Sequence, residues 1–231
     1  MRRIAIAFAT AALLGGCISV SDTTVASGAA SPVAVDAGVP YAAGTSRAVG
    51  EQPPGAYAID PRHASVTWRI RHAGVGVFVA RFDTVGGTIT LDPAHPEKSS
   101  VTATIAASSV NTGVLNTAGA RAFDTEIHTQ VFGSATNPDI TFVSRSIKAT
   151  GPTTGEITGD LTLRGVTRPV TLQASFEGGR FFALRGKQLL GFTARTVINR
   201  KDFGAALSNP AADAFVGDQV EVLISAEAIQ Q

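Results

Sequence analysis

The side chains best suited to chemistry in this sequence are a pair of arginines, a lone cysteine and four histidines. Arg164 and Arg168 lie in the stretch TLRGVTRPVTL, residues 162–172, between two runs of alternating apolar residues. A guanidinium binds phosphate through paired hydrogen bonds, so both arginines are candidates for contacting the head group of a phosphorylated ligand. The alternative is a plain turn from Arg164 to Pro169, in which both arginines are solvated charges.

The four histidines do not form a metal motif. His63, His72, His95 and His128 show no pair at a metal-ligand spacing such as H-E-x-x-H. We therefore expect neither a metal nor another cofactor. By strand alternation His72 points inward, either as a hydrogen-bonded core residue or as a polar contact for a ligand.

Familiar catalytic motifs are also absent from the sequence. There is no G-x-S-x-G, no glycine-rich phosphate loop followed by a helix, and no C-x-x-C. Arg200 and Asp202 in NRKDFG lie two residues apart on one strand face, which predicts a surface ion pair before any chemistry. The sequence thus predicts a protein that is not an enzyme.

The lone cysteine follows an export signal. Residues 1–16 contain a basic start, an apolar run from Ile4 to Leu14 that is too short to span a bilayer, and two glycines before Cys17. This arrangement resembles a bacterial lipobox and predicts a lipoprotein-type signal peptide with acylation of Cys17. The alternative is a soluble exported protein with a cysteine near an ordinary cleavage site. Because Ile18 is not acidic, we expect a lipid anchor in the outer membrane, facing the periplasm.

Composition limits the remaining classes. The 231 residues are 44% hydrophobic and 16% charged with a formal charge of +1, which suits one folded domain plus tails. The basic residues are scattered, so we expect no nucleic-acid partner. Residues 17–55 are rich in small residues and proline without periodicity, and predict a flexible tether that ends at Pro53-Pro54-Gly55.

From residue 56 to 231 the sequence alternates with the period of β-strands. About eight short runs with one apolar face, such as SVTWRIRH, predict an all-β antiparallel barrel or sandwich, with a bulge or bend at Gly86-Gly87. The stretch from Asn116 to Phe132 breaks the pattern and predicts one short amphipathic helix. Alternation aims the following residues inward: Trp68, Ile70, His72, Phe82, Phe142, Leu163, Leu172, Phe176, Phe192, Ala194 and Ile224.

Four segments in order resemble the YceI-like family: YAIDPRHASVTWRIRHAGVG at 57–76, TLRGVTRPVTL at 162–172, GFTARTVINRKDFG at 191–204 and VGDQVEVLISAEA at 216–228. The resemblance implies an extended, eight-stranded, lipocalin-like antiparallel barrel with one short helix. It also implies an apolar pore that binds a polyisoprenoid-type lipid or a quinone.

These features give one leading hypothesis and two others. The leading hypothesis is a membrane-tethered carrier for a polyisoprenoid or an isoprenoid quinone, with the inward residues as the pore lining. The second is an enzyme that acts on a bound prenyl-like ligand through polar pocket groups such as His72. The third is an interaction module with a solid core. The sequence leaves a homodimer open.

Overall fold

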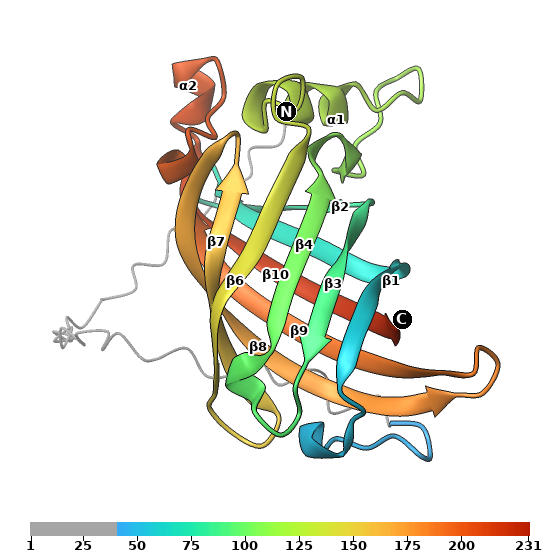
Figure 1. Cartoon of the computed structure of the whole chain (residues 1–231). Helices are drawn as coiled ribbons and strands as arrows, with labels where there is room; N and C mark the ends of the chain where they lie inside the picture. The colour runs from blue at the N-terminus through green and yellow to red at the C-terminus, as the bar shows by residue number, and fades with distance from the viewer. Residues whose placement is uncertain (1–40) are drawn as a thin grey trace, which may run out of the picture. The chain divides into compact units, whose positions relative to one another are not determined.

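The pairing of the first and last long strands closes the sheet into a barrel (Figure 1). The computed structural model describes residues 41–231. The predicted signal peptide 1–16, Cys17 and the first part of the predicted tether lie outside the described residues. The strands are β1 (Gly55–His72), β2 (Gly76–Phe82), β3 (Val85–Leu91), β4 (Ser100–Ala106), β5 (Val110–Asn111), β6 (Asp139–Ala149), β7 (Thr154–Leu163), β8 (Val166–Phe182), β9 (Lys187–Asn199) and β10 (Val216–Gln230).

Eight of these strands form the ring, in the order β1, β3, β4, β6, β7, β8, β9, β10 and back to β1. Every neighbouring pair is antiparallel. The first half of β1 pairs with β3 and the second half pairs with β2, so β2 and the short β5 extend the wall at one end. The predicted fold class, an eight-stranded antiparallel barrel with one short helix, is confirmed.

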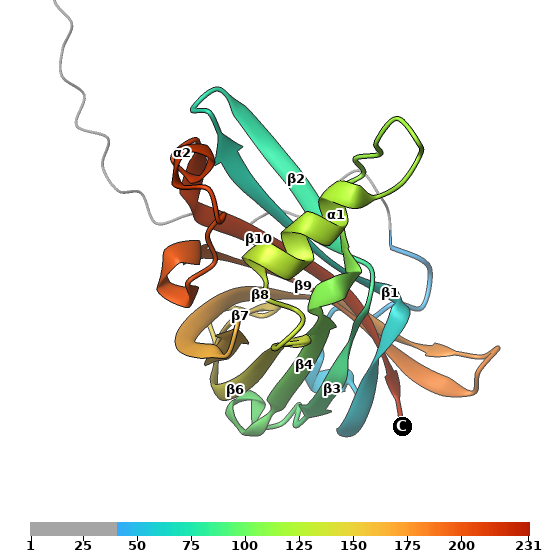
Figure 2. The ribbon, with the colours of Figure 1, turned by 90° about the horizontal axis from the view of Figure 1, so that it is seen from above.

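Short helical segments lie at both ends of the barrel. α1 crosses over one end and α2 lies at the rim of that end, which we call the helix end (Figure 2). The helical segments are α1 (Ala122–Glu126), α2 (Pro210–Asp213), η1 (Val49–Glu51), η2 (Pro96–Lys98), η3 (Ala107–Ser109), η4 (Ile127–Val131) and η5 (Arg200–Phe203). No helix within residues 41–231 combines the length and apolar character needed to cross a bilayer.

The predicted helix begins later than expected. α1 starts at Ala122 and continues as η4 to Val131. The side chain of Asn116 instead accepts hydrogen bonds from the amides of Ala118 and Ala120, at 3.0 and 2.8 Å, which closes a turn. Asparagine stabilises such turns as readily as it caps helices, and this explains the error.

The predicted bend at Gly86-Gly87 is also wrong. Both glycines lie inside β3, in unbroken register with β4, and the chain leaves strand geometry at Asp83 and Thr84 instead. Gly87 has φ +151°, and a Cβ there would collide with the main chain of Thr102. The glycine therefore allows close approach of two strands rather than a bend.

The hairpin TLRGVTRPVTL has a tighter turn than predicted. Leu163 pairs with Val166, and Arg164 and Gly165 have φ values of 56° and 74°, which form a two-residue hairpin turn. Pro169 lies inside β8 opposite Asp160 rather than at the start of the strand. Arg164 is not simply solvated, because its guanidinium donates to the carbonyls of Gln130 and Val131 at 2.6 and 2.8 Å.

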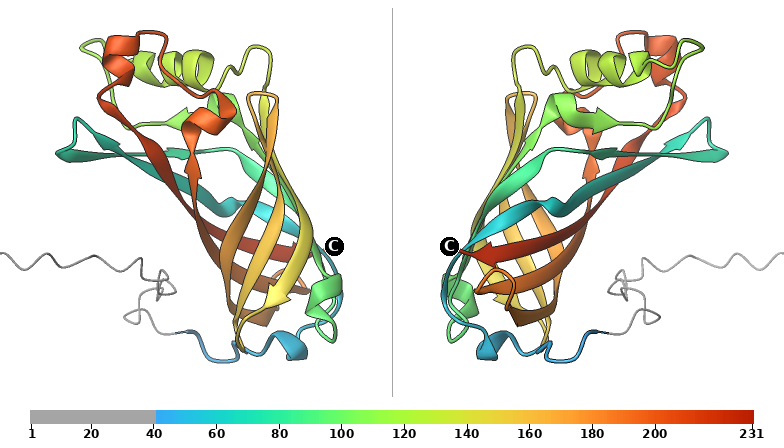
Figure 3. Two further views of the ribbon diagram at one scale, coloured as in Figure 1. Left: turned by 90° about the vertical axis from the view of Figure 1, so that its left-hand side faces the viewer. Right: turned by 90° about the vertical axis from the view of Figure 1, so that its right-hand side faces the viewer.

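The end of the predicted tether packs on the barrel. Ser46 and Gly179 exchange two main-chain hydrogen bonds, of 2.9 and 2.8 Å. Gln52 is buried and occupies the space where a Cβ of Gly179 would lie. The Tyr41 hydroxyl donates to Glu177 at 2.8 Å. Residues 41–54 therefore belong to the folded domain, although composition alone indicates a tether, and they lie at the end opposite α1 and α2 (Figures 1 and 3).

The buried apolar side chains gather in two clusters. One cluster lies under the helices and includes Val66, Phe82 and Phe132. The other includes Tyr57 and Leu190. Partly buried Ala64 packs against both clusters and joins them on the β1 side of the barrel.

Candidate functional site

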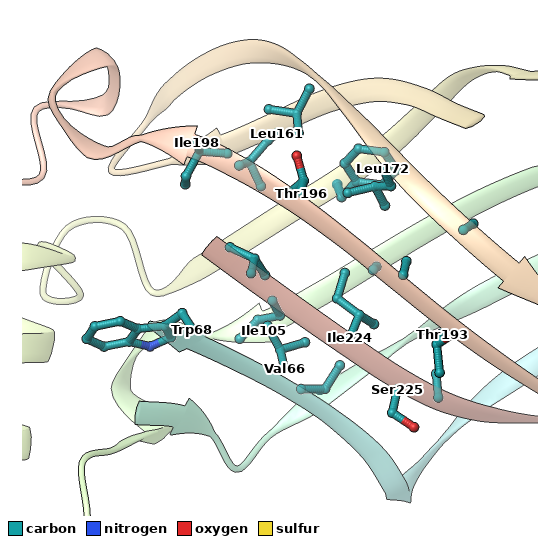
Figure 4. Close-up of a pocket in the computed structure, with 18 of the residues that line it drawn as sticks. Val66, Trp68, Ile105, Leu161, Leu172, Thr193, Thr196, Ile198, Ile224 and Ser225 are labelled. Atoms are coloured by element: carbon teal, nitrogen blue, oxygen red, sulfur yellow. The ribbon is translucent and has the colours of Figure 1, made fainter. Parts of the chain in front are cut away.

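A cavity of about 1230 Å³ runs through the barrel between the two clusters. Its wall includes Phe123 and Phe132 near the helix end, and Pro93 and Pro152 near the other end. Figure 4 shows the wall from inside, with Val66, Trp68 and neighbouring apolar side chains around the space. The volume exceeds the range of roughly 300–1,000 Å³ that is usual for small-molecule sites.

All eleven residues that alternation aims inward lie on the wall of this cavity. They are Trp68, Ile70, His72, Phe82, Phe142, Leu163, Leu172, Phe176, Phe192, Ala194 and Ile224. That they bind a ligand stays a prediction.

Small residues on neighbouring strands keep the middle of the barrel open. Gly155 on β7 lies opposite Ala174 on β8, and Ala174 lies opposite Ala194 on β9. The row continues through Ile224 to Val66 on the far side. In an eight-stranded barrel large side chains are enough to fill the interior, so three small residues side by side leave room for a ligand.

An aromatic group lines the helix end of the cavity. The Trp68 ring lies 5.8 Å from Phe78 and 6.1 Å from Phe132, and Phe132 lies 5.2 Å from Phe82, measured between centroids. These pairs have the tilted and edge-to-face geometries that aromatic rings prefer. The Trp68 Nε1 donor is buried and has no acceptor among the described residues. An unpaired buried donor costs roughly 1–3 kcal/mol, which a ligand oxygen that reached it would recover.

His72 lies at the rim of the cavity rather than in the core. It is exposed, and with Val216 it forms the last register pair between β1 and β10, after a shift of the ladder between Ile70 and His72. Of the two alternatives for His72, the core residue is therefore wrong. The position suits a polar contact at the mouth.

The arginines of the β7–β8 hairpin are not on the cavity wall. Arg164 holds the end of η4 through the two carbonyls described above. Arg168 is exposed, and its guanidinium donates to the carbonyl of Thr167 at 3.2 Å. The cavity wall as described includes neither residue. Their role toward a head group stays a prediction that this geometry does not favour.

Arg200 is buried in a network at the helix end, and the predicted surface pair with Asp202 is wrong. Its guanidinium donates to the carbonyls of Ala205 and Gly217 at 2.9 and 2.8 Å, and to the Asp213 carboxylate at 2.6 Å. The prediction failed because residues 200–203 form η5 rather than a strand. The hydrogen bond from Arg200 holds the pKa of Asp213 below its usual value, although burial opposes this.

A second carboxylate anchors α1. Asp124 is buried, and it accepts hydrogen bonds from the amide and hydroxyl of Thr112 and from Arg121. Burial raises the pKa of Asp124, but these hydrogen bonds and the Arg121 charge outweigh it, so the pKa lies below its usual value. Both carboxylates thus fix segments of the cavity mouth while they are ionised.

The sequence prediction missed several residues of the cavity wall, although strand alternation identifies most of them. Thr196 and Ile198 continue the inward face of Ala194, and Val222 continues that of Ile224. Phe123 and Phe132 come from the helical region, where strand alternation gives no orientation. Within residues 41–231 no group of three or more His, Cys, Asp or Glu side chains could hold a metal ion.

A closed antiparallel ring around an apolar cavity defines a lipocalin-like hollow barrel. Residues 57–228 match the YceI-like domain model, and the chain belongs to the YceI-like family, as the four motifs predict. It is 36% identical over 179 residues to the protein YceI of Escherichia coli O157:H7, which covers 76% of this chain and 87% of that protein.

Two solved structures have a similar fold. One is Burkholderia cenocepacia BcnA, with 20% identity, a TM-score of 0.63, and coverage of 73% of this chain and 98% of that chain. The other is a polyisoprenoid binding domain from Saccharophagus degradans, with 17% identity, a TM-score of 0.58, and coverage of 76% and 98%.

Proposed function

We propose that this protein is a carrier that holds a polyisoprenoid lipid or an isoprenoid quinone inside its barrel. The observation that supports this most directly is the apolar cavity of about 1230 Å³. The similarity to the polyisoprenoid binding domain from Saccharophagus degradans agrees with this choice of ligand. A long apolar chain suits a cavity whose wall runs from the helices to the opposite end of the barrel.

The apolar chain of the ligand supplies most of the binding free energy in this proposal. Burial contributes about 0.8 kcal/mol per carbon group, or about 4 kcal/mol for one five-carbon isoprene unit. The loss of translational freedom and the ordering of the chain subtract from this sum. A few buried units are therefore sufficient for micromolar affinity.

The polar end of the ligand is best accommodated at the helix end. His72 lies at the rim there, and the unpaired Nε1 of Trp68 lies among the aromatic rings. Both could donate to a carbonyl or phosphate oxygen. This places the apolar chain along the row of small residues and toward the opposite end.

The carrier proposal predicts saturable quenching of Trp68 by a long-chain isoprenoid quinone. Trp68 is the only tryptophan and lies on the cavity wall, so its emission reports on the cavity directly. Every described element lies within residues 41–231, so a delipidated protein that begins at Ile18 keeps the whole barrel. We expect a midpoint in the micromolar range, and we expect a non-quenching polyprenyl phosphate to reverse the effect by competition. Unchanged emission together with no calorimetric heat would sink the proposal and favour a solid-core module.

We further propose that the carrier is held at the cell envelope by acylated Cys17, in the outer membrane and facing the periplasm. The support is the position of the only cysteine directly after the export signal. Cys17→Ser should leave the precursor uncleaved or release the protein into the soluble periplasmic fraction, and it should abolish palmitate labelling. Stable anchoring needs more than one acyl chain. A protein sample in which only part of Cys17 is acylated should therefore be released from the membrane in part. If fractionation and labelling are the same as for the unchanged chain, the lipoprotein proposal is wrong.

A further inference from the structure

The β1–β2 hairpin and the residue packed beside its turn expose apolar side chains. Val75 at the turn is 87% exposed, Val77 and Val79 are 48% and 49% exposed, and Phe215 is 61% exposed. The Ala73 amide donates to the Phe215 carbonyl at 2.7 Å, so Phe215 lies beside the hairpin turn. Val77 and Val79 alternate with Phe78, which lines the cavity, so they lie on the outer face of the hairpin. We call Val75, Val77, Val79 and Phe215 the apolar lip. Figure 3 shows that the hairpin projects beyond the barrel wall.

The apolar lip is continuous with the mouth of the cavity. Phe215 belongs to the lip, His72 and Ala73 border it, and all three line the cavity. Contiguous exposed apolar surface is a recognised mark of protein or membrane interaction sites.

The charges around the apolar lip favour a membrane surface. Residues 72–80 contain no Lys, Arg, Asp or Glu, and residues 203–217 contain only Asp213, which pairs with buried Arg200. Arg71 lies opposite Val77 and is exposed, and within residues 41–231 it has no ion-pair partner. Valine and phenylalanine side chains can enter the acyl boundary of a bilayer while an adjacent arginine reaches lipid phosphates.

We propose that the apolar lip docks on a lipid bilayer that contains anionic lipids, so that the cavity mouth opens onto the membrane surface. A second copy of the chain could cover the same region, because only Arg81 and Phe82 of β2 pair with β5 and the edge of residues 76–80 is unpaired. The bilayer fits better because the lip borders the mouth of an apolar cavity and carries an unpaired cation. The inference rests on the proposed carrier function only for what docking achieves, and the docking itself does not depend on it.

The test is flotation of the protein that begins at Ile18 with vesicles of phosphatidylcholine and phosphatidylglycerol in equal parts. The double variant Val75→Asp/Val77→Asp should lose most of the vesicle-bound fraction. Its matched control is Phe181→Asp/Leu184→Asp in the β8–β9 hairpin, where two side chains are similarly exposed, 62% and 89%, far from α1 and α2 (Figure 1). The control should bind like the unchanged protein. Arg71→Gln should weaken binding to mixed vesicles about fivefold and leave weak binding to pure phosphatidylcholine unaltered.

Docking by the lip would be overturned if the unchanged protein did not bind the vesicles, or if the two double variants lost the same share of vesicle binding. It would also be overturned by a dimer in solution that Val75→Asp/Val77→Asp dissociates, because the lip would then bind a second copy of the chain. Trp68 quenching by the quinone should persist in Val75→Asp/Val77→Asp, because neither valine lines the cavity. If the quinone quenched Trp68 in neither the unchanged protein nor its variants while vesicle binding was retained, the carrier function would be refuted and the docking proposal would remain.

Discussion

Ala194→Phe should lower the affinity for a long-chain isoprenoid quinone by about 10- to 100-fold. Ala194 lies in the row of small residues that keeps the barrel open, and its neighbours across the strands are Ala174 and Ile224. A phenylalanine ring there takes up space comparable to one isoprene unit, whose burial is worth about 4 kcal/mol. Rearrangement of the chain recovers part of that loss, and each 1.4 kcal/mol that remains is about tenfold in affinity.

The measurement is the midpoint of Trp68 quenching, and Val197→Phe is the matched control. Val197 is on the same strand but is 59% exposed on the outer face, so the same ring there leaves the cavity unchanged. Denaturant unfolding checks that Ala194→Phe is still folded, since overpacking costs about 1–3 kcal/mol. If both variants bind the quinone equally well, the ligand does not occupy this part of the barrel.

Arg200→Met should destabilise the fold by about 3–5 kcal/mol, because it removes one member of a buried ion pair and leaves the other in place. The Arg200 side chain is 6% exposed and that of Asp213 is 14% exposed. The substitution also leaves the carbonyls of Ala205 and Gly217 without their donor. We expect the segment that carries α2 to loosen first, because Arg200 joins it to the start of β10.

The same substitution should reduce the acid sensitivity of the protein. The folded-state pKa of Asp213 is depressed, so its contribution to stability is complete above the unfolded Asp value of about 3.9 and is lost as the pH falls through the folded value. Denaturant unfolding at pH 7 and below pH 4 measures both effects. Lys201→Met is the control, because its ammonium pairs with Asp218 at the surface and should contribute at most about 1 kcal/mol. Equal stability of the two variants would show that the buried network is not required.

Strand alternation predicted the cavity wall well because the direction of a side chain in a strand depends on its neighbours in sequence. Thus Trp68, Phe176 and Ala194 could be assigned to the interior without knowledge of their partners. Arg164 and Arg200 could not be interpreted in this way. The first contacts η4, more than thirty residues earlier in the chain, and the second contacts Ala205 before α2 and Val216 after it. Such contacts depend on how separate elements meet, and no local pattern encodes that.

The limits of local patterns are clearest in residues 41–54. Their composition is that of a linker, and only two features tie them to the fold. Gly179 lacks a side chain where Gln52 must fit, and Ser46 finds a main-chain partner on β8. The sequence around Gly179 does not indicate which distant segment will pack against this glycine.

The attachment of residues 41–54 also determines where a pulling force acts on the barrel. A force transmitted through the chain before Tyr41 is borne first by the Ser46–Gly179 bridge and the Tyr41–Glu177 hydrogen bond, at the pole away from α1 and α2. Cys17 and Tyr41 are separated by residues 18–40, which can span at most about 80 Å at roughly 3.5 Å per residue. If Cys17 carries the proposed anchor, the barrel is pulled at this pole, while the pole that carries α1 and α2 bears no load.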